Sequence, residues 1–262
     1  MFPRKMVAVI VAVCAVLSGS ACGAVTGALS SSEPSDSWAG STSAADPESE
    51  PSSGAGSDQT EPEIEPNTQN APSWGCEEAG DTFESDVLLA RCLTENFWMR
   101  QFQAIGGTYE PIRDFVPYSG SDGPTCGGQP SVANNAFYCS DGHFIAFDAG
   151  WLQGMYQQLG DAAVYVVIPH EFGHAVQAQL TQNFNFSVER ELQADCYAGG
   201  TLNALIQAQQ LRADPGDDSE IINNLQAAGD PTDAWWEPGA HGTPERRQSA
   251  FATGYQQGVT AC

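Results

Sequence analysis

The chain has 262 residues, with 33 acidic and 9 basic side chains and a formal net charge of −24. A nucleic-acid partner needs clustered lysine and arginine for its phosphates, and Lys5 is the single lysine of this chain. We therefore expect no nucleic-acid partner. The acidic balance favours solubility and would attract cationic peptides more than anionic ones.

Residues 1–22 have the pattern of a secretory signal peptide. Arg4 and Lys5 precede an apolar run over residues 6–17, and small residues follow. The run is short for a membrane span, so an uncleaved anchor is the less favoured interpretation.

Cys22 is the predicted lipid-modified residue. The stretch 17–23 resembles a bacterial lipoprotein cleavage box, except that Gly19 stands where the box usually has a larger aliphatic residue. We expect an exported protein that a lipid on Cys22 anchors to the membrane, facing outside the cytoplasm. Cleavage near Ala21 or Ala24, followed by plain secretion, is the alternative.

Residues 23–73 consist mainly of Ser, Pro, Gly, Glu and Asp. Such a segment cannot bury enough apolar surface to offset its ordering entropy. We expect a disordered acidic tether with an average span of about 40 Å. Residues 74–262 are then one folded domain, long enough for a sizeable core.

Patterns in the first half of this domain predict one helix and a small sheet. Apolar residues at helical spacing indicate a helix over 82–104. A Gly/Pro-rich segment follows, in which residues 109–116 are expected to form a short strand before Pro117. Residues 136–139 and 143–148 flank a Ser-Asp-Gly turn and predict a β-hairpin.

The second half is predicted to be helical. We expect helices at 152–159, at 188–208 and at 220–228, the last capped by Ser219. Thr243 followed by Pro244 is a strong helix start, and this helix should end near residue 257. The predicted fold class is α+β, mostly helical with a small sheet.

Six cysteines fall in the domain, an even number that indicates three disulfides in an exported chain. Fifteen pairings are formally possible. Adjacency along the chain suggests these pairs: Cys76–Cys92, Cys126–Cys139 and Cys196–Cys262. A cysteine-ligated metal is the weaker alternative, because the chain has no C-x-x-C pair.

His170-Glu171-Phe172-Gly173-His174 carries the clearest chemical signal. On a helix, His170 and His174 leave the same face one turn apart, which suits two corners of a zinc tetrahedron. Glu171 lies beside them, where a carboxylate can take a proton from water. Pro169 implies either a helix that starts near Val166 or a longer, kinked helix.

Glu191 and Asp195 complete the predicted site. Glu191 is the best candidate for a third zinc ligand, and Asp195 follows it by one helical turn. From there, the Asp195 carboxylate could accept the second ring N–H of a ligand histidine.

The stretches H-E-F-G-H-A-V-Q and E-L-Q-A-D-C-Y-A-G, with His241-Gly242-Thr243 before a last helix, resemble the neutral zinc metallopeptidase family of bacteria. The E-x-x-x-D element is also similar to the thermolysin-like zincins. The resemblance implies a zincin-like domain in which His170, His174 and Glu191 bind Zn²⁺, Glu171 is the base, and Asp195 supports His170. It further implies that a strand beside the motif helix pairs with extended peptide, and 143–148 is the candidate.

The expected activity is peptide hydrolysis by metal-activated water. His241, just before the last helix, is our candidate donor to the developing negative charge, although it could simply pack the loop. Tyr197 is a second candidate donor, and His143 is expected on the strand surface. Trp235-Trp236 could wall a substrate groove or cover the core.

Two other functions stay open. The protein could be a zinc-stabilised binding or assembly lipoprotein with a vestigial protease site. A glutamate beside an open coordination site argues against this, because a purely structural zinc has no use for it. A lytic enzyme acting on cell-wall peptides would share the metal and differ only in substrate.

Overall fold

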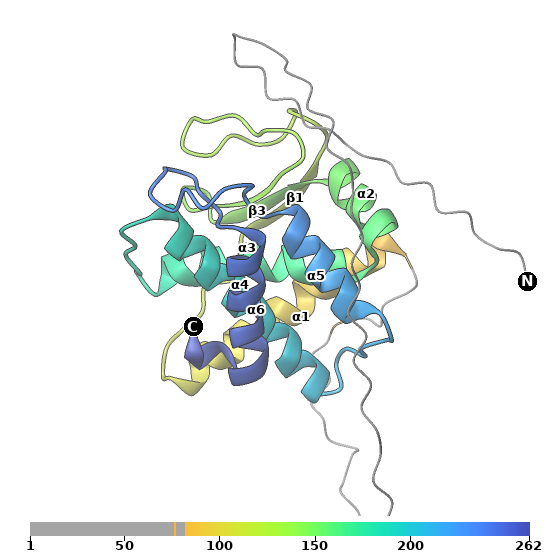
Figure 1. The fold of residues 1–262 in the computed structure, drawn as a ribbon. Coiled ribbons are helices and arrows are strands. Elements are labelled where there is room, and N and C mark those ends of the chain that lie inside the picture. The colour runs from red at the N-terminus through yellow and green to blue at the C-terminus, as the bar shows by residue number, and fades with distance from the viewer. Residues whose placement is uncertain (1–75, 77–81) are drawn as a thin grey trace, which may run out of the picture. The chain divides into compact units, whose positions relative to one another are not determined.

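The computed structural model describes Cys76 and residues 82–262. The predicted signal peptide (1–22), the tether (23–73) and Cys22 lie outside the described residues. The described chain is helical around a three-stranded sheet, so the α+β expectation is confirmed. Figure 1 shows the arrangement of these elements.

The first helix, α1, spans Phe83–Ala104 and matches its prediction to within one residue. It begins there because the Thr82 hydroxyl accepts a hydrogen bond from the Ser85 amide, which satisfies one of the free N–H groups of the first turn. Its apolar residues at helical spacing, among them Leu93, Phe97 and Phe102, are buried in the core.

The sheet contains β1 (Asp114–Tyr118), β2 (Ala136–Cys139) and β3 (Phe144–Asp148). The predicted hairpin is present, since β2 pairs antiparallel with β3. The first strand was predicted too early, because β1 starts at Asp114 and includes Pro117. Pro117 is tolerated since β1 is an edge strand, pairing only with β3 among the described strands.

The strand order β1-β3-β2 corrects the prediction for residues 143–148. β3 is the central strand and is paired on both sides, in parallel with β1 and antiparallel with β2. Its main-chain groups are therefore not free to pair with a peptide. β2 is an edge strand, with β3 as its one partner among the described residues.

Helix α2 (Ala149–Leu159) leads into α3 (Ala162–Gln179), which carries the first motif. Of the two predicted possibilities, the longer helix is the one found, and it continues through Pro169. α3 is buried around most of its circumference, as expected for a helix with neighbours on several sides. It packs against α1, α2, α4, α5 and β2.

Helix α4 (Ser187–Gln207) carries the second motif and lies against α3. Gly173 allows this approach, because a Cβ at that position would lie 3.0 Å from the Ala194 Cα. The close contact brings the histidines of α3 beside the carboxylates of α4.

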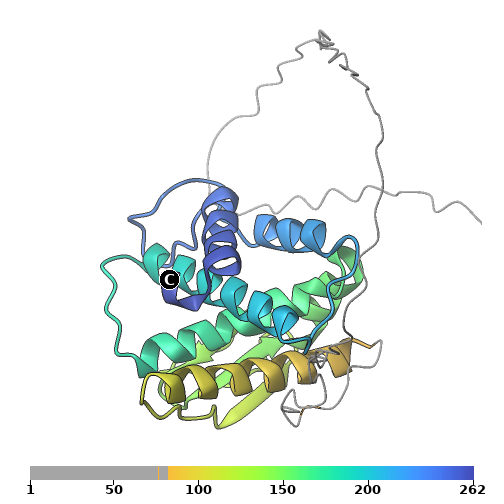
Figure 2. The ribbon, with the colours of Figure 1, turned by 90° about the horizontal axis from the view of Figure 1, so that it is seen from below.

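Helix α5 spans Asp217–Ala227, three residues earlier than predicted, and its N-cap is Gly216 rather than Ser219. Helix α6 (Pro244–Gln257) starts as predicted, with the Thr243 hydroxyl accepting from the Arg246 amide. A short 3₁₀ turn, η2 (Val259–Ala261), follows α6 and precedes Cys262. Figure 2 shows α1 and the sheet on one side of α3, and α5 and α6 on the other.

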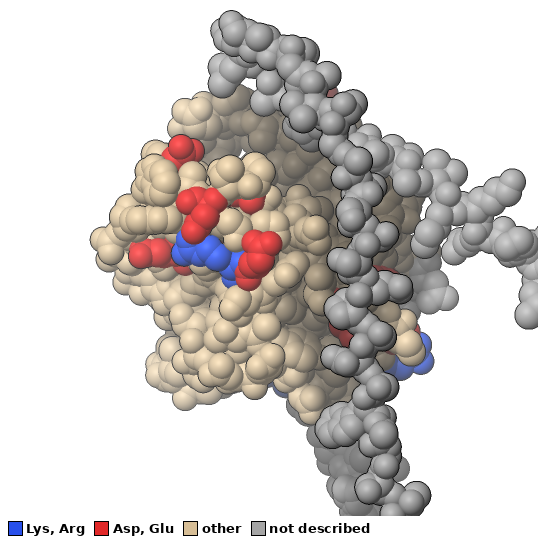
Figure 3. Space-filling view, viewed as in Figure 1, with Lys and Arg blue, Asp and Glu red and all other residues tan. Residues whose placement is uncertain are grey.

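The three disulfides suggested by adjacency are present: Cys76–Cys92, Cys126–Cys139 and Cys196–Cys262. The last joins α4 to the residue after η2. On the face shown in Figure 3, basic side chains lie against acidic ones and do not gather into a patch. Among the described residues, no helix combines the length and apolar character needed to cross a membrane.

Candidate metal centre

Three potential ligand atoms, from helices α3 and α4, lie close together in the domain. The Glu191 Oε2 lies 3.2 Å from the His170 Nε2 and 3.5 Å from the His174 Nε2. The two imidazole rings stand nearly perpendicular, with centroids 4.7 Å apart. The structure thus brings together the three residues that the sequence motifs predicted as ligands.

The spacing of these atoms fits a zinc ion. Two ligand atoms bound at about 2.0–2.1 Å and separated by the tetrahedral angle lie about 3.4 Å apart. The two distances from Glu191 bracket this value. Two imidazole nitrogens and one carboxylate oxygen are also a ligand set that catalytic zinc uses, so the group can hold a metal ion.

A buried pair of opposite charges supports His170. Its Nδ1 donates to the Asp195 Oδ1 at 2.8 Å. The Arg247 guanidinium donates to both oxygens of the same carboxylate, at 2.8 Å each, and to the Ala228 carbonyl at 2.8 Å. Asp195 is fully buried and Arg247 is 6% exposed. The His170 ring is thereby held with Nδ1 protonated and Nε2 facing the ligand cluster.

The charges of this cluster shift its pKa values strongly. Burial lowers the pKa of His170, but the charge and hydrogen bond of Asp195 and the hydrogen bond of Glu191 outweigh it and raise the pKa to about 10. Burial would raise the pKa of Asp195, but the Arg247 charge holds it below its usual value. Burial would also raise the pKa of Glu191, but its contacts with His170 and His174 outweigh burial and lower it.

A neutral amide supports His174. The His174 Nδ1 donates to the Gln177 Oε1 at 2.9 Å. Gln177 is 3% exposed and its own amide donates to the Arg190 carbonyl at 2.7 Å and to the Gln193 Oε1 at 3.1 Å. This contact leaves the His174 Nε2 directed toward Glu191.

Arg190 orients the carboxylate of Glu191. Its guanidinium donates to the Glu191 Oε1 at 3.1 Å. Since Oε1 is occupied in this way, Oε2 is the oxygen that faces the two histidines. The Arg190 side chain is 54% exposed, so this ion pair positions Glu191 more than it stabilises the fold.

Glu171 lies in the same cavity as the three ligands. The cavity has a volume of about 650 Å³, and its lining includes His170, Glu171, His174 and Glu191. Glu171 is 6% exposed, and its Oε2 has no hydrogen-bond partner among the described residues. A buried carboxylate oxygen without a partner is uncommon, so the Glu171 carboxylate is the buried acidic group of this cavity that the described protein atoms leave unsatisfied.

The edge strand β2 forms one wall of the cavity. Asn134, Asn135, Ala136, Phe137 and Tyr138 line it. Among the described strands β2 pairs only with β3, so the strand at this wall is an edge strand. The strand that borders the site is therefore β2, one strand earlier than the sequence resemblance implied.

His241 also lines the cavity, from the loop before α6. Its side chain is 54% exposed, its amide donates to the Asp230 Oδ2 at 2.7 Å, and its Nδ1 lies 3.5 Å from the Asp230 Oδ1. Asp230 thus fixes the main chain of this loop. The exposed imidazole can turn toward a ligand in the cavity.

The other aromatic candidates lie elsewhere. Tyr197 is buried against Trp98 and accepts from Gln182, outside the cavity lining. His143 is buried rather than on the strand surface, with its ring nitrogens at the Tyr138 hydroxyl and the Glu110 carbonyl.

Trp235 and Trp236 are exposed and absent from the cavity lining, so they neither wall this site nor cover the core. Trp235 packs edge-on against Phe186 at the start of α4.

Sequence reasoning missed three supporting residues: Gln177, Arg190 and Arg247. The contact of Gln177 could have been predicted from the sequence, since Gln177 lies three residues after His174 on the same helix face. Arg247 carried a weaker indication. A cation in the first turn of a helix opposes the helix dipole, which suggests that it has a specific acidic partner. Arg190 had no such indication beyond its place next to Glu191.

Comparison with known proteins gives a consistent result. Residues 50–262 match the family described as "Putative neutral zinc metallopeptidase". The chain is 34% identical over 202 residues to uncharacterized protein YpfJ of Escherichia coli strain K12, covering 68% of each chain. It is 32% identical over 170 residues to uncharacterized protein Mb2605 of Mycobacterium bovis, covering 54% of this chain and 58% of the relative. No solved structure matches the chain.

Proposed function

Since the chain belongs to the neutral zinc metallopeptidase family, we propose that it is a zinc-dependent peptidase acting on peptide or protein substrates. The family implies Zn²⁺ as the cofactor and peptide as the substrate class. The observation that carries the proposal is the convergence of His170, His174 and Glu191 beside the unpartnered carboxylate oxygen of Glu171.

The residues have distinct roles in this hydrolysis. Held by the three ligands, zinc would lower the pKa of a coordinated water to about 7 and polarise the scissile carbonyl. Glu171 accepts the proton of the attacking water and passes it to the leaving amine. His241 donates a hydrogen bond to the negative charge that develops on the carbonyl oxygen, with the N-terminus of α6 beside it.

The substrate lies in extended form along β2. The free edge of this strand offers main-chain donors and acceptors at the wall of the cavity. Pairing of this kind gives affinity through main-chain hydrogen bonds and little selectivity for side chains. The proposal therefore includes flexible peptide segments as substrates, and peptides of the cell wall are compatible with it.

The alternative, a binding or assembly protein with a vestigial site, has less support. A structural zinc is usually closed by four protein ligands, whereas this cluster offers three among the described residues. Such a site would also gain nothing from a buried glutamate with a free oxygen.

We place the enzyme outside the cytoplasm, anchored through Cys22. This part of the proposal rests on the sequence of residues 1–22. A diacylated cysteine should partition with membranes. Cys22→Ser should release the protein or block its processing, whereas Cys14→Ser, inside the apolar run over residues 6–17, should do neither. A soluble wild-type protein with an unmodified N-terminus would replace anchoring with plain secretion.

Hydrolysis of a mixed peptide library tests the enzyme activity. Wild-type protein should cleave, and a zinc chelator should abolish cleavage. Glu171→Gln should retain zinc and lose about 10²–10⁴-fold in rate, because the amide keeps the shape but cannot accept a proton. Glu84→Gln, an exposed site on α1, is the matched control and should cleave normally.

Full activity in the Glu171→Gln variant would remove Glu171 from the mechanism. Bound zinc without cleavage of any peptide by the wild type would favour the binding-protein alternative.

A further inference from the structure

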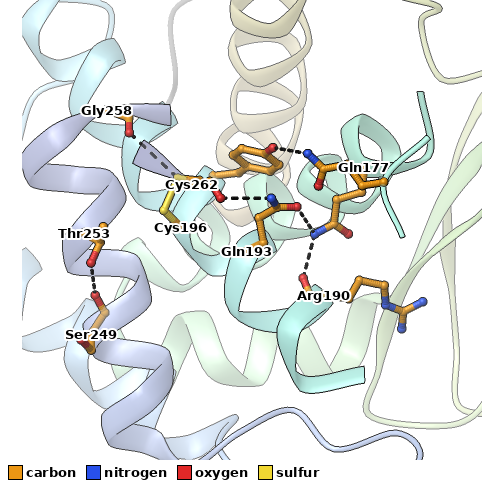
Figure 4. The surroundings of a disulfide bond; sticks show 10 residues. Gln177, Arg190, Gln193, Cys196, Ser249, Thr253, Gly258 and Cys262 are labelled. Carbon is orange, nitrogen blue, oxygen red and sulfur yellow. Dashed lines mark hydrogen bonds between the residues drawn. A yellow bond between two sulfur atoms is a disulfide. The ribbon is translucent and has the colours of Figure 1, made fainter. Parts of the chain in front are cut away.

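Two glutamines, one from each motif, form a chain of hydrogen bonds that leads away from His174. Gln177 accepts from the His174 Nδ1 at 2.9 Å and donates to the Gln193 Oε1 at 3.1 Å. Gln193 in turn donates to the main-chain oxygen of Cys262 at 3.1 Å. Figure 4 shows the part of this chain from Gln177 to Cys262 beside the Cys196–Cys262 disulfide.

Main-chain acceptors fix the direction of every bond in the chain. The oxygens of Arg190 and Cys262 can only accept, so the amide nitrogens of Gln177 and Gln193 must face them. The Oε1 of Gln193 then faces Gln177, and the Oε1 of Gln177 faces His174. Turning either amide over would place donor against donor or acceptor against acceptor.

This fixed direction selects the tautomer of His174. Because the Gln177 Oε1 can only accept, the neutral imidazole must carry its proton on Nδ1. The lone pair is then on Nε2, the atom that lies 3.5 Å from the Glu191 Oε2 at the ligand cluster. In this tautomer the Nε2 lone pair of His174 is the one that can bind a metal.

The disulfide holds the far end of the chain in place. Cys196 lies three residues after Gln193, on the same face of α4. Its bond to Cys262 keeps the Cys262 main-chain oxygen within reach of the Gln193 amide. Without this tie, that oxygen would depend on the short η2 turn for its position.

We propose that Gln193 is a positioning residue of the zinc centre, acting through Gln177 to hold His174 as its Nδ1–H tautomer. The Cys196–Cys262 disulfide anchors this chain of hydrogen bonds, which we call the relay. The inference rests on the proposed function, in that it takes His174 as a zinc ligand. Beyond the contact of Gln177 with His174 described above, it adds a role for Gln193 and for the Cys196–Cys262 disulfide.

The test compares Gln193→Met, which keeps the side-chain length and removes both amide contacts, with the wild type. The matched control is Gln179→Met, because Gln179, on α3, is also a glutamine that contacts main chain, at Glu110, but it has no hydrogen bond to a residue that supports a ligand. Zinc affinity is measured by competition with a chelator. We expect a loss of about 5-fold for Gln193→Met, below the roughly 10–100-fold typical of a residue that touches a ligand.

Nuclear magnetic resonance provides the readout that general destabilisation would not move. In the zinc-loaded protein, the His174 Nδ1 proton should exchange with solvent faster in Gln193→Met, while the His170 Nδ1 proton stays unchanged as an internal reference. A Cys196→Ala/Cys262→Ala variant should show the same selective change, and Cys76→Ala/Cys92→Ala should not.

Unchanged His174 exchange and unchanged zinc affinity in Gln193→Met would overturn the relay while leaving the zinc site intact. If the wild type bound no zinc, the proposed function would fail instead. The tautomer of His174 would then be measured in the metal-free protein. A single Nδ1–H tautomer in the wild type and a mixture of tautomers in Gln193→Met would support the relay. A mixture of tautomers in both proteins would refute it.

Discussion

His170 and His174 face the same centre from consecutive turns of α3, but the groups that hold their rings differ in charge. His170 rests on the Asp195–Arg247 pair, buried among α3, α4 and α6. His174 rests on the uncharged amides of Gln177 and Gln193. Both arrangements place a proton on Nδ1 and leave Nε2 for the metal, so the same ring orientation is reached by two kinds of chemistry.

The difference in charge predicts that losing the support of His170 destabilises the fold more than losing the support of His174. Removing one partner of a buried ion pair leaves an uncompensated charge and costs about 3–5 kcal/mol. Removing a neutral hydrogen-bond partner leaves at most an unsatisfied polar group, which costs about 1–3 kcal/mol. Loss of the charged support should therefore damage folding and metal binding together, and loss of the neutral support should damage mainly metal binding.

The largest effect is expected for Asp195→Ala. The change strands the buried Arg247 cation and frees the His170 ring, so the free energy of unfolding should fall by about 3–5 kcal/mol and zinc affinity by about 10–100-fold. Denaturant unfolding and chelator competition measure the two quantities.

The control is Asp233→Ala, which breaks the exposed pair of the neighbouring Arg246 and should cost at most about 1 kcal/mol. Equal effects of the two changes would mean that the buried Asp195–Arg247 pair contributes no more to stability than the exposed Asp233–Arg246 pair.

An intermediate effect is expected for Arg247→Leu. Asp195 keeps its hydrogen bond to His170, so zinc affinity should fall by about 10-fold or less. The carboxylate nevertheless stays buried without its cation, so the free energy of unfolding should again fall by about 3–5 kcal/mol. Arg246→Leu is the adjacent control. A loss of zinc affinity without loss of stability would show that Arg247 acts on the metal and not on the fold.

The smallest effect on stability is expected for Gln177→Leu. The free energy of unfolding should fall by about 1–3 kcal/mol, because the His174 N–H and the Arg190 carbonyl lose a partner. Zinc affinity should fall by about 10-fold, at the lower end for a residue that touches a ligand. If stability fell as far as in Asp195→Ala, the contrast between charged and neutral supports would not hold.

The local parts of this account could be predicted from the sequence, and the parts that depend on tertiary order could not. The i, i+4 histidines and the Glu191–Asp195 turn are periodic features of single helices, so their shared face was predictable. The position of Arg247 was not, because it reaches Asp195 from 52 residues away. Nothing in the spacing of these residues specifies how α6 docks on α4.

The sheet shows the same limit. The β2–β3 hairpin was visible in its turn and its strands, but β1 pairs in parallel with β3. That pairing makes β3 central and leaves β2 as the edge at the cavity. Strand order depends on the packing of β1 onto the hairpin, so the hairpin pattern could not say which strand borders the cavity, and the resemblance pointed to 143–148 instead of β2.

Metal analysis of the purified domain tests the central claim most directly. The wild-type protein should contain one zinc ion per chain, and the His170→Ala/His174→Ala variant should contain none, while its disulfides and its helical content are retained. The His143→Ala/His241→Ala variant, which changes the other two histidines of the chain, should keep its zinc. Zinc that persists in the His170→Ala/His174→Ala variant would contradict the site described above.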